Sequence, residues 1–317
     1  MLKSLYNIES RKGLYMSTIN KTFADGEIII KEGDLGDSFF QLLEGNAVVY
    51  LNYGLEGQVK LTELQPGQYF GEMAVIETYP RSSTVVAQGS ASVIEIPGSE
   101  LDSYFKENPD KIIAIMKHLG ERLKIMTADY DEAKKILADM KADVGETKGN
   151  AFTAMIKKHV DFFKGIKYNM NKPSAEALRQ ANGKAAGAGA KNVETYNKGT
   201  IIFKAGEIGK CMYILHGGSV GIYSNFGKEG QTRLTELFPN DCFGEMGMIA
   251  EETRSATAVV EADETYVEII RPDDLEEMFK ESPVKVDMIL RHLSYRLRVL
   301  TFDYFNVCKE ISEFFNK

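Results

Sequence analysis

The chain contains one sequence pattern twice, and this duplication restricts the folds that it can adopt. The stretch GEMAVIETYPRSST at residues 71–84 returns as GEMGMIAEETRSAT at residues 244–257. The register holds over about 100 residues, at an offset of 173 that becomes 174 after one inserted residue. The two copies must therefore share one fold. With 44% apolar residues in 317, the chain is able to build a core for each.

Each copy predicts short strands followed by a long helix. Segments such as EIIIKEG, QLLEGNAVVYLN and SVIEI are rich in Val, Ile and Tyr and are separated by glycine, which is typical of a small antiparallel barrel or jelly roll. After Pro109, and again from Val284, apolar residues recur at helical spacing. We therefore expect a mostly β fold with helices, in which two tandem jelly-roll β-barrels are each followed by a long C-terminal helix.

The same pattern divides the chain into three segments. We predict a first ligand-binding domain at residues 1–140 and a second at residues 192–317. The intervening segment, residues 141–191, begins helically and then passes into NGKAAGAGAK. A run this rich in Gly and Ala is typical of a linker.

Charge and composition exclude several classes of protein. The net charge of −8 argues against a general nucleic-acid binder, which needs clustered Lys and Arg. The N-terminal residues lack the apolar region of a signal peptide, and no run of 18 apolar residues predicts a membrane span. A cytoplasmic location is expected, because the cysteines lack CxxC spacing and are predicted to be reduced. They are Cys211, Cys242 and Cys308.

The repeated motif combines groups that suit a phosphate joined closely to a sugar. Gly71 supplies backbone freedom and is expected to open a short helical turn, whose free N–H groups attract an anion. Arg81 offers planar donors for two phosphate oxygens, and Ser82 adds a hydroxyl donor. Glu72 would repel a phosphate, so we expect it to accept from a ribose hydroxyl. The alternative is an internal salt bridge between Arg81 and Glu72, which the joint repetition of Gly, Glu, Arg and Ser disfavours.

These stretches resemble the cyclic-nucleotide-binding domains. That family includes the catabolite activator transcription factors, the regulatory subunits of cyclic-AMP-dependent protein kinase and nucleotide-gated channels. The resemblance lies in KEGDLGDSFFQLLEG (31–45) and FGEMAVIETYPRSST (70–84), and in KAGEIGKCMYILHGG and FGEMGMIAEETRSAT of the second copy. It implies a cyclic nucleotide as ligand, with no further cofactor, and a C-terminal helix that closes over the ligand.

The resemblance assigns roles to individual residues. Glu72 and Glu245 would accept from the ribose 2′-hydroxyl, and Arg81 and Arg254 would pair with the cyclic phosphate. Hydroxyls on the C-terminal helices would meet adenine, so cyclic AMP is preferred, while the serine after each arginine leaves cyclic GMP open. The ligand-binding set is Gly71, Glu72, Met73, Ala74, Arg81, Ser82 and Thr127 in the first copy, and Gly244, Glu245, Met246, Gly247, Arg254, Ser255 and Thr301 in the second.

Two further groups of residues admit two interpretations each. The leucines would line the base or simply pack in the core, and the tyrosines would cover a purine as lids or pack on the barrel or on another helix. They are Leu61, Leu64, Leu234 and Leu237, and Tyr130 and Tyr304. The second copy departs further from the family pattern, because Pro80 becomes Thr253 and Asp37 becomes Lys210.

Other functions lack their motifs. The four histidines are scattered, so we expect no metal site, and the absence of a nucleophile elbow or P-loop predicts that the chain is not an enzyme. The chain ends about a dozen residues after Phe305, so no helix-turn-helix and no DNA binding are expected, and residues 1–20 hold no arginine-rich pseudosubstrate. The predicted function is a cyclic-nucleotide sensor that signals to an unidentified protein partner; the alternative is a scaffold that has lost nucleotide binding. The chain is expected to be a monomer with an internal pseudo-two-fold axis or a homodimer.

Overall fold

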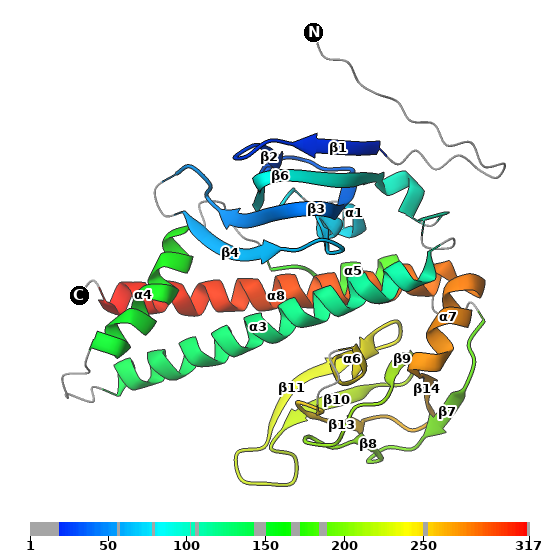
Figure 1. Ribbon diagram of the computed structural model, residues 1–317. Coiled ribbons are helices and arrows are strands. Elements are labelled where there is room, and N and C mark those ends of the chain that lie inside the picture. Colours follow the sequence, from blue (N-terminus) through cyan, green and yellow to red (C-terminus); the bar gives the residue numbers. More distant parts are fainter. Residues whose placement is uncertain are drawn as a thin grey trace, which may run out of the picture.

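The computed structural model has two β units on opposite sides of a pair of long helices (Figure 1). Residues 1–18, which the sequence assigned to the first domain, and residues 184–188 of the predicted linker lie outside the described residues. The structure describes residues 19–55, 58–77, 80–101, 103–104, 108–142, 150–165, 172–183, 189–249 and 253–315.

The first unit is an antiparallel sheet in the order β1-β6-β3-β4, with β2 paired to β6 and β5 paired to β3. Its two long strands, β3 and β6, each have buried stretches on both sides of a short exposed run, and the buried residues contribute to the core of the barrel. The elements are β1 (Ile19–Phe23), β2 (Ile28–Ile30), β3 (Ser38–Leu51), β4 (Val59–Leu64), β5 (Tyr69–Phe70), α1 (Glu72–Glu77) and β6 (Thr84–Pro97).

The second unit repeats this plan in two four-stranded sheets, β11-β10-β13-β8 and β12-β9-β14-β7. Together β9 and β10 correspond to β3, and β13 and β14 correspond to β6, so each long strand of the first unit is divided here. The elements are β7 (Val193–Tyr196), β8 (Ile201–Phe203), β9 (Met212–Gly217), β10 (Val220–Ser224), β11 (Thr232–Leu237), β12 (Cys242–Phe243), α6 (Glu245–Ile249), β13 (Thr257–Val260) and β14 (Thr265–Ile270).

A matched glycine marks the bend in each long strand. Gly45 and Gly218 both have φ of +79°, a conformation that other residues rarely adopt. A Cβ atom on Gly45 would lie 2.0 Å from the carbonyl oxygen of Ser90, and one on Gly218 would lie 2.1 Å from Oγ1 of Thr265. Glycine therefore allows the strand to change direction against its neighbour in both units.

Helices connect and join the two units. The proline at the first position of α3 and of α7 suits a helix start, because its missing N–H would be unpaired there. The helical elements are the 3₁₀ turn η1 (Gly98–Glu100), α3 (Pro109–Lys141), α4 (Asn150–Gly165), α5 (Ala175–Asn182), α7 (Pro272–Glu281) and α8 (Pro283–Phe315). Within the described residues, no helix is both long and apolar enough to cross a membrane.

Helices α3 and α8 lie side by side, and one hydrophobic core runs through both units around them (Figure 1). Leu119 and Leu123 of α3 and Leu293 and Leu297 of α8 are almost fully buried in this core. The relation is reciprocal: α8 packs against α1 of the first unit, and α3 packs against α6 of the second. Each long helix therefore meets the short helix of the other unit.

Helix α4 lies outside both repeats and packs across α8, α3 and β4. Its buried residues Ile156 and Val160 form a second helical core with Cys308 and Ile311 of α8. The predicted linker segment thus contains two helices, α4 and α5, of which α4 closes one end of the helix pair.

Candidate functional site

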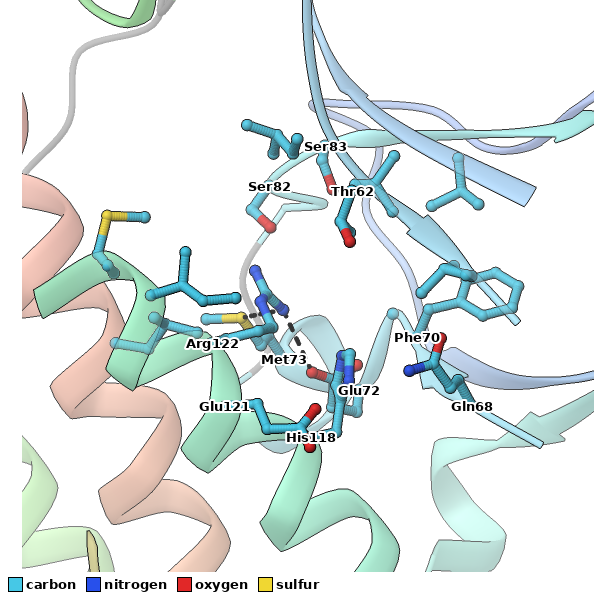
Figure 2. A pocket seen from close by; sticks show the side chains of 18 of the residues that line it. Thr62, Gln68, Phe70, Glu72, Met73, Ser82, Ser83, His118, Glu121 and Arg122 are labelled. Atoms are coloured by element: carbon cyan, nitrogen blue, oxygen red, sulfur yellow. Dashed lines mark hydrogen bonds and ion pairs between the residues drawn. The ribbon is translucent and has the colours of Figure 1, made fainter. Parts of the chain in front are cut away.

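A cavity of about 220 Å³ lies beside the repeated motif of the first unit (Figure 2). We call residues 70–84 the first cassette, residues 243–257 the second cassette, and this space the first cavity. The barrel supplies one wall and helices α3, α4 and α8 supply the other. Eight residues predicted for the first copy line it: Leu61, Leu64, Gly71, Glu72, Met73, Ala74, Arg81 and Ser82.

Backbone carbonyls hold the guanidinium of Arg81 in place. Its Nη1 donates to the carbonyl of Gly71 at 2.7 Å and its Nη2 to that of Ser38 at 2.5 Å. A Cβ atom on Gly36 would lie 2.1 Å from Nε of Arg81, so glycine is needed for this approach. Burial lowers the pKa of Arg81, and the nearby carboxylates of Glu72 and Asp37 oppose this effect. Arginine stays charged under such shifts, so the cavity has a fixed cation in its wall.

The second cassette places Arg254 in the same way. Its guanidinium donates to the carbonyl of Gly244 and, at 2.7 Å, to that of Cys211. Cys211 stands 173 residues after Ser38, so the two arginines use equivalent carbonyls. The Arg254 guanidinium also lies 4.3 Å from the ring centroid of Phe203, a distance typical of a cation–π contact. In both units the arginine is held by main-chain groups.

Glu72 is the second buried charge of the first cavity. Its side chain is 2% exposed, and its Oε1 lies 3.5 Å from Nη1 of Arg122 on α3, as Figure 2 shows. Its Oε2 is buried and has no hydrogen-bond partner among the described residues. An unpartnered buried carboxylate oxygen is costly, so this position calls for a donor such as a ligand hydroxyl. Glu245 repeats the arrangement with Arg296 of α8, and its Oε2 is also unpartnered within the described part of the chain.

The start of α1 contributes main-chain donors. The helix begins at Glu72, after Gly71 at φ of +78°, as the sequence predicted. The first N–H groups of a helix have no intrahelical partner. Ala74, Ser82 and Ser83 also line the first cavity, so main-chain and hydroxyl donors surround the position beside Arg81.

The predicted adenine contacts on the long helices lie elsewhere. The hydroxyl of Thr127 donates to the carbonyl of Leu123 at 2.7 Å, and that of Thr301 donates to Leu297 at the same distance. Neither threonine is among the residues that line the first cavity. Each hydroxyl proton is used within its own helix, but the hydroxyl oxygen can still accept a hydrogen bond, so the adenine contact stays a prediction.

The two predicted tyrosine lids also behave differently from one another. Tyr130 packs in the helical core, with the ammonium of Lys134 4.4 Å from its ring centroid. Tyr304 is 1% exposed and lines the first cavity, although it belongs to the second unit. The first cavity is therefore lined by both long helices, α3 of its own unit and α8 of the other.

The remaining predicted residues of the second unit lie in β11 and in the second cassette. Leu237 is buried in the core of the barrel, whereas Leu234 is 58% exposed. Gly247 lies so close to Gly209 that a Cβ atom on Gly209 would be 2.4 Å from its Cα. Met246 is half-buried and Ser255 is exposed.

Sequence reasoning missed several cavity residues. Arg122 and Arg296 occupy matching places in ERL and YRL at the 174-residue offset, so a signal for them was present. Phe162 of α4 has no counterpart in the repeat, and no sequence signal identified it. His118 lines the cavity as well. Burial lowers its pKa, and the Glu72 carboxylate partly opposes this, so a neutral imidazole faces the ligand space at neutral pH. In the described ranges no three His, Cys, Asp or Glu residues gather where they could hold a metal ion.

Comparison with protein families agrees with the repeat and its geometry. The model of the cyclic nucleotide-binding domain matches residues 20–108 and 193–282, more than half of the chain. The protein therefore belongs to the cyclic nucleotide-binding domain family and contains two copies of that domain.

The chain is similar in sequence to three curated proteins. A cAMP-dependent protein kinase regulatory subunit of Debaryomyces hansenii is 26% identical over 261 residues, covering 82% of this chain and 45% of the relative. A cGMP-dependent protein kinase of Plasmodium berghei is 24% identical, covering 79% of this chain and 37% of the relative. The type II regulatory subunit of Drosophila melanogaster is 38% identical over 89 residues, covering 28% of this chain and 23% of the relative. The chain thus spans less than half the length of these three proteins.

Among solved structures, the regulatory domain of Toxoplasma gondii PKA with cAMP is similar over 86% of this chain and 83% of its own, at 19% identity and a TM-score of 0.27. A cAMP-bound structure named PfPKA-R is similar over 85% and 75%, at 19% identity and a TM-score of 0.33.

Proposed function

We propose that the protein is a regulatory sensor that binds a cyclic nucleotide in the first cavity. The observation that carries this proposal is the buried, unpartnered Oε2 of Glu72 in the same cavity as the fixed cation of Arg81. A cyclic phosphate would accept from Arg81 and Ser82, and the ribose 2′-hydroxyl would donate to Glu72. The equivalent pair Arg254 and Glu245 supports a second site of the same kind.

A ligand in the first cavity would touch the barrel and the long helices together. It would therefore favour the arrangement in which these walls lie close, and it acts only through its higher affinity for that state. Arg122 links α3 to Glu72, so the ribose contact is coupled directly to a helix that also meets the second cassette.

The ligand and the output are proposed more specifically from the relatives. Cyclic AMP is the first candidate and cyclic GMP the second, since both nucleotides occur in the names of curated relatives. We propose a protein partner in the cytoplasm, with a protein kinase as the first class to test, and no catalytic or DNA-binding role for this chain. The reciprocal packing of α3 and α8 supports a single chain that provides both halves of the pair.

The two cassette arginines provide the test of this function. Each of Arg81→Ala and Arg254→Ala should weaken the affinity of its own site for cyclic AMP about 10- to 100-fold, because a charge-assisted contact contributes roughly 1.5–3 kcal/mol. The double variant should show no binding in titration calorimetry. Arg233→Ala, which removes an exposed arginine of β11, is the matched control and should bind as wild type does.

The competing function, a scaffold without nucleotide binding, predicts a different outcome. A true sensor at 100 times the dissociation constant gains about 2.7 kcal/mol of stability per site, so cyclic AMP or cyclic GMP should raise the melting temperature. A melting temperature unchanged by either nucleotide, or a double variant that binds as wild type does, would contradict the proposed function.

A further inference from the structure

A groove of about 720 Å³ lies where α3 of the first unit meets the second unit. Helix α3 forms one wall, α6 and the start of α7 form the others, and residues 208–210, between β8 and β9, form the rim. Helix α3 contacts both α6 and α7, and Figure 1 shows the three helices together. We call this space the interface groove. Among the described residues, none lines both this groove and the first cavity, and neither Glu245 nor Arg254 borders it. The groove is therefore distinct from both predicted nucleotide sites.

The interface groove has an apolar floor that continues onto an exposed side chain. Met248, Ile249 and Leu275 are buried at its base. Ile208 on the rim is 73% exposed, so most of this large apolar side chain is open to water. A lone exposed isoleucine is common on protein surfaces, but one that extends an apolar groove adds to a patch that a partner is able to cover. The groove therefore offers a continuous apolar surface to a side chain from another molecule.

The backbone of the second cassette holds Ile208 in this exposed position. Ile208 forms an isolated antiparallel bridge with Thr253. Next to it, the N–H of Arg254 donates to the carbonyl of Glu207 at 2.8 Å, and the N–H of Gly206 donates to the carbonyl of Arg254 at 2.8 Å. A contact surface that is already fixed loses little conformational entropy on binding, which favours affinity. The exposed isoleucine is therefore preorganised for a partner.

Three cations surround the apolar floor. Lys117 of α3, Lys210 of the rim and Arg271, just before α7, line the groove and are exposed. In the part of the chain that the structure describes, none of the three forms an ion pair. Asp273 is the one carboxylate among the described lining residues, so positive side chains outnumber negative ones here by three to one. In a chain with a net charge of −8, the groove is thus a local site for a molecule that carries carboxylates.

The matched surface of the first half has a different chemistry. At offsets of 173 and 174, aspartate replaces the lysine of the rim and the isoleucine of α3, and arginine replaces the lysine of α3. The matched pairs are Lys210 and Asp37, Ile113 and Asp287, and Lys117 and Arg291. The Nη2 of Arg291 lies 2.7 Å from Oδ2 of Asp287, so this cation is already paired. The combination of apolar and unpaired cationic groups therefore belongs to the second half alone and is not a requirement of the fold.

We infer that the interface groove is the docking site for an acidic segment of a partner protein. One apolar side chain of that segment would contact the floor and Ile208, and flanking carboxylates would lie beside Lys117 and Lys210. A nucleic acid fits this surface less well, because its phosphates need more clustered cations and make no use of an apolar floor. The inference goes beyond the proposed function, because it identifies a surface for the partner and does not require a bound nucleotide. Since α3 forms a wall and the second cassette holds the rim, the partner recognises the two units packed together.

Peptide selection on the full chain tests this docking site. A display library of random twelve-residue peptides is selected on wild type and depleted on Ile208→Asp, which retains only peptides that depend on the groove. These peptides should combine an apolar residue with several Asp or Glu residues, and their affinity in fluorescence anisotropy should fall as salt is raised. Lys210→Asp places the residue of the first half in the groove. It should weaken the peptides at least about 10-fold, because it sets a carboxylate against their carboxylates.

Leu35→Asp is the matched control for these variants. Leu35 is the counterpart of Ile208 in the first half, is 84% exposed and is not among the residues that line the groove. The retained peptides should bind this variant as they bind wild type. Because Ile208, Lys210 and Leu35 are all exposed, the three variants should unfold in urea close to wild type.

Several outcomes would overturn the inference. It is wrong if no peptide is retained, if the retained peptides are neutral or basic, or if Lys210→Asp binds them as wild type does. It is also wrong if no acidic peptide binds while vesicles of phosphatidylserine and phosphatidylcholine bind wild type more tightly than Lys210→Asp. In each case cyclic AMP binding by wild type would leave the proposed function standing. Acidic peptides that bind in the groove while neither cyclic nucleotide binds would support the docking site and contradict the proposed function.

Discussion

His292 illustrates what burial does to a titratable side chain in this protein. It is 6% exposed on α8, and its Nδ1 has no hydrogen-bond partner among the described residues. Burial lowers its pKa to about 4. Its equivalent in the first unit, His118, faces the first cavity, so the two matching histidines have different surroundings. Position in the repeat therefore does not determine the environment of a residue.

The low pKa of His292 predicts a loss of stability in mild acid. In the unfolded chain histidine has a pKa of about 6.5, so the unfolded state binds more protons between pH 6.5 and 4, and stability falls as the pH falls through that range. Protonation of His292 should therefore lower the free energy of unfolding by about 2 kcal/mol between pH 7 and pH 5. His292→Gln should therefore lose less stability than wild type over this interval in urea unfolding. Equal losses would mean that His292 is not buried in the neutral form.

At the scale of elements, the bent strand depends on a backbone conformation. Gly45 combines a positive φ with a close approach to β6, whereas Gly89 has φ of +71° but open space around its Cα. Gly45→Ala should reduce the free energy of unfolding by clearly more than Gly89→Ala, for which conformational strain alone costs about 1–2 kcal/mol. Urea unfolding of both variants measures the difference. Equal effects would show that contact with Ser90 does not constrain the bend.

The strands and helices of the two units were predictable because the sequence pattern of each one occurs twice in the chain. The barrels, the short helix after Gly71 and the long helices all follow from spacing and glycine positions, and the residues of the first cassette lie together in the cavity as expected. The adenine contacts of Thr127 and Thr301 stay a prediction, because each hydroxyl donates to its own backbone here and sequence alone does not show what its oxygen accepts. Phe162 could not be predicted, because its place depends on how α4 packs across two other helices.

At the scale of the whole molecule, the two units share one core. Buried residues from both barrels and from both long helices belong to a single cluster. The reciprocal contacts, α8 on α1 and α3 on α6, are those of a two-fold interface in which each partner offers the same surface. The repeat predicted two similar units and raised such pairing as a hypothesis, but which long helix meets which short helix became visible only in the structure.

The shared core predicts that the units unfold together. Leu293 of α8 is fully buried in it, so Leu293→Ala should lower the stability of the whole molecule by about 2–5 kcal/mol. Calorimetry should show one transition in wild type that moves to lower temperature in the variant without splitting. Two separate transitions in wild type would contradict a common core.

The reciprocal pair of long helices also changes how the protein can evolve. In a symmetric assembly of identical chains, one substitution alters both pockets at once. Here each half is encoded separately, so matched positions can differ. The first half has Pro80 and Asp37, whereas the second half has Thr253 and Lys210 at the corresponding positions. A fused pair can thus tune one half for its ligand and the other for a different task, without losing the fit between them.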